Sequence, residues 1–169
     1  MPEAKHGTRP GSYANGDDFR RVFHDETDSL YRLAFLLTAD REKAQQCFVS
    51  GLEESLNGTS VFREWARSWA RRTIIQNAIR AINPRPVGEY ASSSFDDGST
   101  TPAREPGETD AVPRLEPFER FVYVMSVLES YSDLDCSLLL GCARRDVIAA
   151  RARTLRQIES QSACTVSAR

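Results

Sequence analysis

The strongest constraint on the fold is a stretch near the C-terminus in which two helical patterns meet at a single glycine. Ser132 precedes the first pattern and Asp135 stands three positions later, which is a variant of the capping box that begins many helices. Three leucines then recur at helical spacing and are expected to face a core: Leu134, Leu138 and Leu139. Gly141 follows them, at the place where a left-handed residue commonly ends a helix. This pattern predicts a short helix closed by a tight turn.

The residues after Gly141 predict a second helix with an apolar side and a basic side. At about 100° per residue, the apolar side comprises Val147, Ala150, Thr154, Leu155 and Ile158. Five arginines oppose or flank it, against the single acid Asp146: Arg144, Arg145, Arg151, Arg153 and Arg156. An arginine-rich face alone is most simply a solvated face. Together with the capped helix and the glycine turn, however, it has the layout of a helix-turn-helix, whose second helix lies in the DNA major groove. We therefore predict that these five arginines contact DNA.

Helical spacing of apolar residues also covers residues 17–82. We expect a turn at 38–40, a helix over 41–56 and, after a break at 57–58, a last helix over 61–82 that Ser60 could cap. The N-terminal half is thus predicted to be helical throughout.

The last of these predicted helices is basic and aromatic. Between Arg63 and Arg80 there are five arginines and one acid. Trp65 and Trp69 are four residues apart and share a helix face with Phe62, so we expect at least one of the two tryptophans to lie in the core. Positive charge is therefore concentrated in two helices of the chain.

Composition changes sharply over residues 83–117. This segment holds six of the eight prolines, together with seven acids and three arginines, and it predicts a flexible acidic linker rich in proline and serine. The polar residues 1–16 predict a disordered arm, and residues 161–169 predict a frayed tail. The sequence thus predicts an all-α protein in which two small helical domains, 17–82 and 118–160, are joined by the linker, with the helix-turn-helix in the second domain.

Composition also argues against several classes of function. The net charge of −2 does not suit a general binder of polyanions. The four cysteines lack zinc-type spacing and the two histidines are isolated, so no metal and no cofactor is expected, and Cys47, Cys136 and Cys142 are expected to be core residues. No glycine-rich phosphate loop or nucleophile–base pair points to an enzyme. The absence of a membrane-length apolar run and of a signal-peptide core predicts a cytoplasmic protein without membrane insertion.

The order of these parts resembles a bacterial RNA polymerase sigma factor. The compact size is similar to the extracytoplasmic-function group, which keeps only the second and fourth conserved sigma regions. The similarity covers roughly Phe19–Ile82 and Leu115–Ile158. It implies a protein that binds core RNA polymerase and directs it to promoter DNA.

The segment Leu30–Gln46 resembles the family's polymerase-binding segment, which contacts the clamp helices of the largest polymerase subunit. The family commonly has an aspartate-alanine-glutamate-aspartate-leucine run there, whereas residues 43–47 of this chain read lysine-alanine-glutamine-glutamine-cysteine. The resemblance implies that the polymerase-binding residues include Asp40, Arg41, Gln45 and Gln46.

Two further segments resemble the promoter-reading parts of the family. Phe62, Trp65 and Ala70 match its spacing in the helix that opens the −10 element, where arginines follow phosphates and aromatic rings stack on unpaired bases. The −10 contacts implied are Trp65, Arg67, Arg71, Arg72, Asn77 and Arg80. The range Leu115–Ile158, with Glu119 and Arg120 at the family's glutamate-arginine pair, implies −35 contacts from the five arginines of residues 144–156. Its departures from the family pattern are Asp146, Ile148, Ala149 and Ala150.

The sequence therefore predicts a sigma-like transcription initiation factor whose partners are core RNA polymerase and promoter DNA, with an anti-sigma factor as a further candidate. The alternative is a sigma-like DNA-binding regulator, or a partner of another sigma or anti-sigma factor, that does not itself initiate transcription. The neutral amides of Gln45 and Gln46, where the family has acids, motivate this alternative.

Overall fold

The computed structural model describes residues 13–57, 60–86 and 111–166. In these ranges the chain forms seven α-helices and no strand, apart from an isolated antiparallel bridge between Tyr13 and Phe62. The predicted all-helical class is confirmed for this part of the chain. Most of the predicted arm, the middle of the predicted linker and the end of the predicted tail lie outside the described residues.

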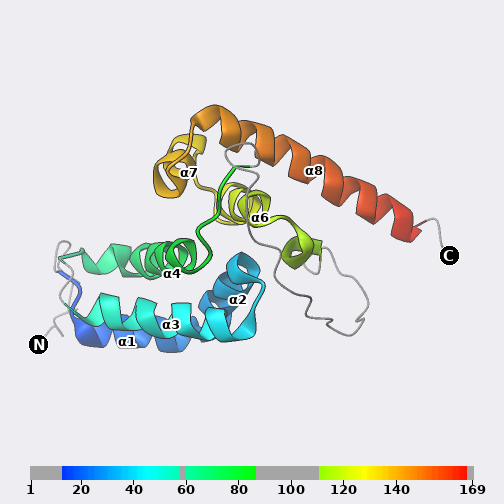
Figure 1. The fold of residues 1–169 in the computed structure, drawn as a ribbon. Coiled ribbons are helices and arrows are strands. Elements are labelled where there is room, and N and C mark those ends of the chain that lie inside the picture. Colours follow the sequence, from blue (N-terminus) through cyan, green and yellow to red (C-terminus); the bar gives the residue numbers. More distant parts are fainter. Residues whose placement is uncertain (1–12, 58–59, 87–110, 167–169) are drawn as a thin grey trace, which may run out of the picture.

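Four helices form the N-terminal part of the molecule, blue to green in Figure 1: α1 (Gly16–Asp25), α2 (Thr27–Thr38), α3 (Arg41–Leu56) and α4 (Ala66–Ile82). Asn15 caps α1 by accepting hydrogen bonds from the backbone of Asp17 and Asp18 at 3.0 Å. Asp40 caps α3 in the same way, and α3 has the predicted bounds. All three long helices, α2, α3 and α4, pack on one another, and α1 packs on each of them.

The helix α4 begins later than predicted. The 3-10 turn η1 (Arg63–Trp65) precedes it, and Ser60 does not cap it. The physical reason is that residues before η1 are held extended: the backbone N–H of Ala14 donates to the Val61 carbonyl at 2.7 Å, and the Tyr13 ring stacks on Phe62 at 5.0 Å. The predicted disordered arm is therefore too long, because Tyr13–Gly16 are ordered by these contacts and by the α1 cap.

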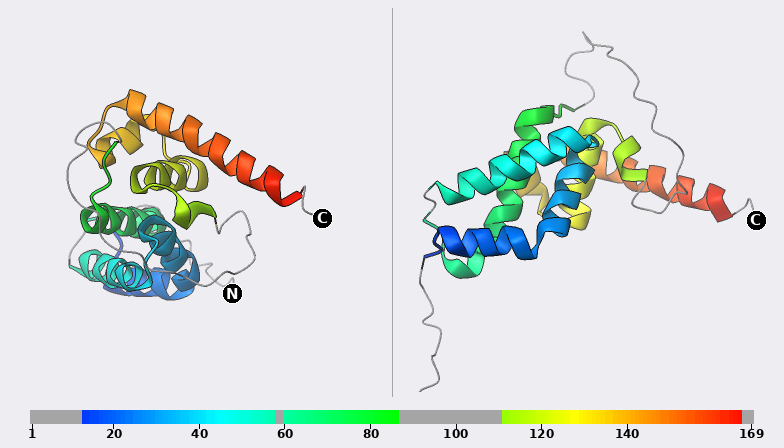
Figure 2. Two further views of the ribbon diagram at one scale, coloured as in Figure 1. Left: turned by 45° about the vertical axis from the view of Figure 1, so that its right-hand side comes forward. Right: turned by 90° about the horizontal axis from the view of Figure 1, so that it is seen from below.

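The C-terminal part consists of η2 (Val112–Arg114), α6 (Pro117–Tyr123), the π-helical turn η3 (Val124–Leu128), α7 (Asp133–Leu140) and α8 (Arg144–Val166). Two predicted boundaries are corrected here. Val112, assigned to the linker, is buried at 1% exposure. The helix α8, which projects from the body of the molecule in Figure 2, continues through most of the predicted tail.

The predicted helix, glycine turn and helix are formed by α7 and α8. Ser132 caps α7 by accepting from the Asp135 backbone N–H at 3.1 Å, and Gly141 ends it in the left-handed conformation with φ +63°. The prediction for the leucines is wrong: Leu134 and Leu138 are 55% and 72% exposed. A different face of α7 turns inward, carrying Cys136, Ser137 and Leu140, and Leu139 is only partly buried.

The N-terminal and C-terminal helices pack against each other through a seam formed by α2 on one side and η2, α6 and η3 on the other. One continuous cluster of buried apolar side chains crosses this seam. Arg120 of α6, only 6% exposed, donates from Nε to the Leu37 carbonyl at 2.9 Å and from Nη2 to the Thr38 carbonyl at 3.4 Å. Its Nη1 donates to the carbonyls of Pro113 and Leu115. The buried Arg120 guanidinium thus donates hydrogen bonds to carbonyl groups at the C-terminal end of α2, across the seam.

Candidate nucleic-acid and polymerase interfaces

The helix α8 presents part of its positive charge to solvent. Its inner side is formed as predicted by Val147, Ala150, Thr154 and Ile158, all buried. Arg144, Arg145 and Arg156 are exposed, and the side chain of Arg145 is 89% accessible, with Asp146 at 3.7 Å. These three guanidiniums are free to meet an external anion without breaking a close contact to another helix.

The other two arginines of α8 are tied to the C-terminal part itself. Arg151 forms a two-pronged ion pair with Asp133 at the start of α7. Arg153 donates from Nε to Glu119 of α6 at 2.8 Å. The carboxylates are 13% and 12% exposed, so both pairs are partly shielded from solvent. They fix α8 against its neighbours, a role that counting charges in the sequence did not reveal.

The outward face of α8 also carries apolar residues. Ile148 and Leu155 are 45% and 38% exposed, and Ala149 is exposed beside them. Leu155, expected on the buried side, therefore lies at its edge. A protein that reads DNA through this helix would place two apolar side chains and three arginines against it.

The helix α4 carries an exposed aromatic residue at its start. Trp65 is 57% exposed and its ring meets Phe62 edge-on, with 5.3 Å between ring centroids. Tyr13 stacks on Phe62 in turn. Trp69, four residues on, packs on a small cluster formed by Phe19, Val61 and Ala66. The expectation that at least one tryptophan belongs to the core is thus confirmed for Trp69, and Trp65 is left as the open ring.

The arginines of α4 differ in how much they are already engaged. Arg72 is exposed. Arg67 pairs with Glu26 at 3.0 Å but stays 71% exposed, and the exposed Arg80 pairs with Glu54. Arg71 is 30% exposed, the least of these arginine side chains whose exposure is given, and it contacts two other elements of the chain. Its Nη1 donates to both carboxylate oxygens of Glu129 in the C-terminal part, at 2.6 and 2.7 Å.

Asn77 does not join these arginines. Its side chain is 9% exposed and its Nδ2 donates to the Thr73 carbonyl at 2.9 Å, so it belongs to the inner face of α4. It is not positioned to touch a nucleic acid that lies on the outer face.

A cleft of about 620 Å³ opens beside Trp65 and was not anticipated from the sequence. It is lined by residues of both parts of the chain: Ser60, Val61, Phe62, Trp65, Ser68, Trp69, Arg72, Gln76 and Tyr131. Burial raises the pKa of the Tyr131 hydroxyl, and the positive charge of Arg72 offsets part of this rise. The indole Nε1 of Trp69 is buried and has no hydrogen-bond partner. The cleft thus combines aromatic walls with polar groups, and the only sequence signal for it was the aromatic spacing of α4.

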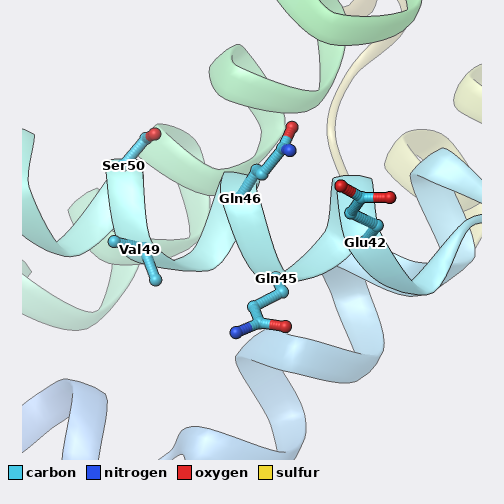
Figure 3. A pocket seen from close by; sticks show the side chains of 5 residues that line it. All are labelled: Glu42, Gln45, Gln46, Val49 and Ser50. Atoms are coloured by element: carbon cyan, nitrogen blue, oxygen red, sulfur yellow. The ribbon is translucent and has the colours of Figure 1, made fainter.

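The predicted polymerase-binding residues lie on or beside α3 but do not form one uniform patch. Asp40 is occupied as the helix cap, and Arg41 is exposed next to it. Figure 3 shows Gln45 and Gln46 on different sides of α3, where they line a shallow pocket of about 390 Å³ together with Glu42, Val49 and Ser50. Val49 is 45% exposed. The surface is polar with one apolar side chain, and Glu42 is its acidic residue.

The three described cysteines are free thiols. Cys47 and Cys136 are buried as expected, whereas Cys142 is half-buried. Burial, with smaller contributions from Asp133 and Asp135, raises the pKa of Cys136 to about 11. Over the part of the chain that the structure describes, no group of three histidine, cysteine or acidic residues is placed to hold a metal ion, and no helix is long and apolar enough to cross a bilayer.

Comparison with models of known protein families, and with curated proteins, finds no match to this chain.

Proposed function

We propose that this chain is a sigma-like transcription initiation factor that binds core RNA polymerase and directs it to promoter DNA. The observation that carries the proposal is the arrangement of α7, the left-handed Gly141 and α8, with exposed Arg144, Arg145 and Arg156 on the second helix. A helix held in this way by a preceding helix can enter the major groove, and its arginines can contact phosphates and base edges. In this proposal α8 binds the −35 element.

The second nucleic-acid surface in this proposal is the outer face of α4, which would engage the −10 element. Trp65 offers an open ring on which an unpaired base can stack, and exposed Arg67 and Arg72 lie on the same helix to neutralise phosphates. Stacking on an aromatic ring contributes about 1–3 kcal/mol per base. The surface therefore suits separated strands better than a closed duplex.

The polymerase-binding surface in this proposal is the part of α3 that carries Arg41, Gln45 and Gln46. No catalytic residue is assigned, because polymerase supplies the chemistry. The place of action is the cytoplasm, where polymerase and chromosome meet. An anti-sigma factor is a further candidate partner. The two helical parts act as two promoter-reading domains joined by the segment between them.

Transcription from promoter DNA with purified core polymerase tests the proposal. The full chain is expected to yield a transcript that starts at a defined position, and the core enzyme alone is not. Arg145→Ala together with Arg156→Ala should lower this transcript, since it removes two of the exposed charges from α8. A chain that neither binds core polymerase nor supports any specific transcript would rule the proposal out.

The second candidate is a DNA-binding regulator, or a partner of another sigma or anti-sigma factor, that does not initiate transcription. It is favoured by the neutral Gln45 and Gln46 on α3 and by exposed Ile148 on the outer face of α8. Gln45→Glu with Gln46→Asp separates the two candidates. Stronger core binding by this variant supports a weakened initiation factor, and no gain in core binding supports the regulator.

A further inference from the structure

A short polar contact between the N-terminal and C-terminal parts involves a residue that the proposed function assigns to nucleic-acid binding. Arg71 lies on α4, and Glu129 follows η3 in the C-terminal part. The guanidinium donates to both oxygens of this carboxylate at 2.6 and 2.7 Å, and to the Ser29 hydroxyl at 2.6 Å. Glu26 is a more distant second carboxylate at 3.8 Å.

This contact differs from the other ion pairs of α4. Glu129 is 13% exposed and Arg71 is 30% exposed, whereas the Arg67 side chain is 71% exposed and the Arg80 side chain is 60% exposed in their own pairs. A partly shielded pair, in which one guanidinium nitrogen donates to both carboxylate oxygens, is screened less by solvent than an exposed pair, so its carboxylate competes more strongly with an external anion. Arg71 is therefore the α4 arginine that a phosphate has most difficulty in recruiting.

The seam keeps Glu129 in place. The buried Arg120 joins α6 to the carbonyl end of α2, and apolar packing continues on either side of it. Glu129 comes immediately after η3, which contacts α2 itself. As long as the seam is closed, Glu129 stays opposite Arg71. Separation of the two parts would remove the Glu129 carboxylate and leave Arg71 with the Ser29 hydroxyl and the more distant Glu26, so its Nη1 would become available to an external anion.

We infer that the closed seam is a low-affinity form in which Glu129 acts as an internal substitute for a nucleic-acid phosphate on Arg71. This inference rests on the proposed function of α4. It couples nucleic-acid binding by α4 to the separation of the two helical parts: a partner that draws the parts apart also releases one more cation for the nucleic acid. The chain alone binds single strands more weakly than its exposed charge suggests.

The test compares full-length chains in binding a fluorescein-labelled single-stranded oligodeoxynucleotide, followed by fluorescence anisotropy at several salt concentrations. Glu129→Gln removes the competing charge and keeps the side-chain shape. We expect it to bind about fivefold more tightly than the unmodified chain, which corresponds to roughly 1 kcal/mol. The slope of log K against log salt should steepen by about 0.7, the value for one additional phosphate contact on a single strand.

Two variants control for other causes. Glu53→Gln removes one negative charge from an exposed position of α3 and reports the effect of net charge alone; less than a twofold change is expected. Arg71→Gln breaks the same contact but removes the cation, so it should bind no more tightly than the unmodified chain. Glu129→Ala is a second version of the key change and carries the test if Glu129→Gln loses its helical circular dichroism.

The outcomes separate the two proposals. Tighter binding by Glu129→Gln but not by Glu53→Gln or Arg71→Gln supports the inference. Binding by all chains with no difference between Glu129→Gln and Glu53→Gln overturns the inference and leaves the proposed function standing. Equal tightening by Arg71→Gln also overturns it, because the gain would then come from an opened seam and not from the freed guanidinium. No binding by any of the chains, Glu129→Gln included, overturns the inference, whereas core binding and promoter-dependent transcription decide the proposed function.

Discussion

Replacement of Arg120 by methionine should destabilise the whole molecule, because this side chain holds the seam. Its guanidinium donates to four carbonyl oxygens, two at 2.9 and 3.2 Å and two at 3.3 and 3.4 Å. A buried acceptor left without a donor costs about 1–3 kcal/mol. The two shorter bonds alone therefore correspond to roughly 2–6 kcal/mol. Burial lowers the pKa of the Arg120 guanidinium, which reflects the cost of removing the charge from water and offsets part of the gain. We expect a loss of about 3 kcal/mol in the free energy of unfolding.

Urea unfolding followed by far-ultraviolet circular dichroism measures this loss. Because the apolar cluster crosses the seam, the chain should unfold in one transition, and Arg120→Met should shift its midpoint without changing its slope. The matched control is Arg114→Met, since Arg114 is an exposed arginine on the neighbouring η2; it should change stability by less than about 0.5 kcal/mol. A loss below about 1 kcal/mol for Arg120→Met would show that Arg120 does not hold the seam. Two separate transitions in the unmodified chain would show that the two helical parts unfold independently.

Four further substitutions test other parts of the structure. Gly141→Ala should lower the free energy of unfolding, measured by thermal unfolding, by about 1 kcal/mol, because alanine is strained at a φ of +63°. The loss should be no larger, because an added Cβ would meet nothing within 4 Å. A loss above about 3 kcal/mol would instead indicate a steric clash. Trp65→Ala should weaken single-strand binding, measured by anisotropy, about tenfold with little change in stability. Trp69→Ala should lower stability, measured by urea unfolding, by about 3 kcal/mol. The opposite pattern would show that Trp69 is the exposed stacking ring and Trp65 the core residue. The raised pKa of Cys136, about 11 against 9.0 in an open chain, means that the folded state holds its proton longer than the unfolded state. The stability that this thiol contributes is full below pH 9 and is lost as the pH rises toward 11. The urea midpoint should therefore fall over this interval, and Cys136→Ala should make that fall smaller. An unchanged fall would contradict the raised pKa of Cys136.

Capping residues and helical spacing predicted helix ends and buried faces well where neighbouring residues alone determine them. The bounds of α3 follow from the Asp40 cap and the break after Leu56, and the end of α7 follows from Gly141. The inner side of α8 follows from helical spacing, because Val147 and Ile158 lie on the same face of the helix and both are buried. Spacing alone failed for α7, since a helix this short offers two apolar faces and only its packing decides between them. Leu138 therefore lies outside and Leu140 inside.

The features that depend on distant residues could not be predicted from the sequence. Arg71 and Glu129 are 58 positions apart, and Arg120 lies 83 positions from Leu37, so neither contact has a local signature. The N-terminal arm gives a third example, since Tyr13 and Ala14 are ordered by stacking on Phe62 and by a backbone hydrogen bond to Val61. For the candidate site, the sequence identified the basic helices but not which of their arginines are already paired within the molecule.

Copurification with core RNA polymerase tests whether the chain is a sigma-like initiation factor. The full chain, carrying an affinity tag, is mixed with purified core enzyme and passed over a size-exclusion column at moderate salt. We expect a stable complex that contains the chain and all core subunits, and we expect Gln45→Glu with Gln46→Asp to increase the bound fraction. If neither the unmodified chain nor this variant comigrates with core polymerase, the claim that the chain is a sigma-like initiation factor is contradicted.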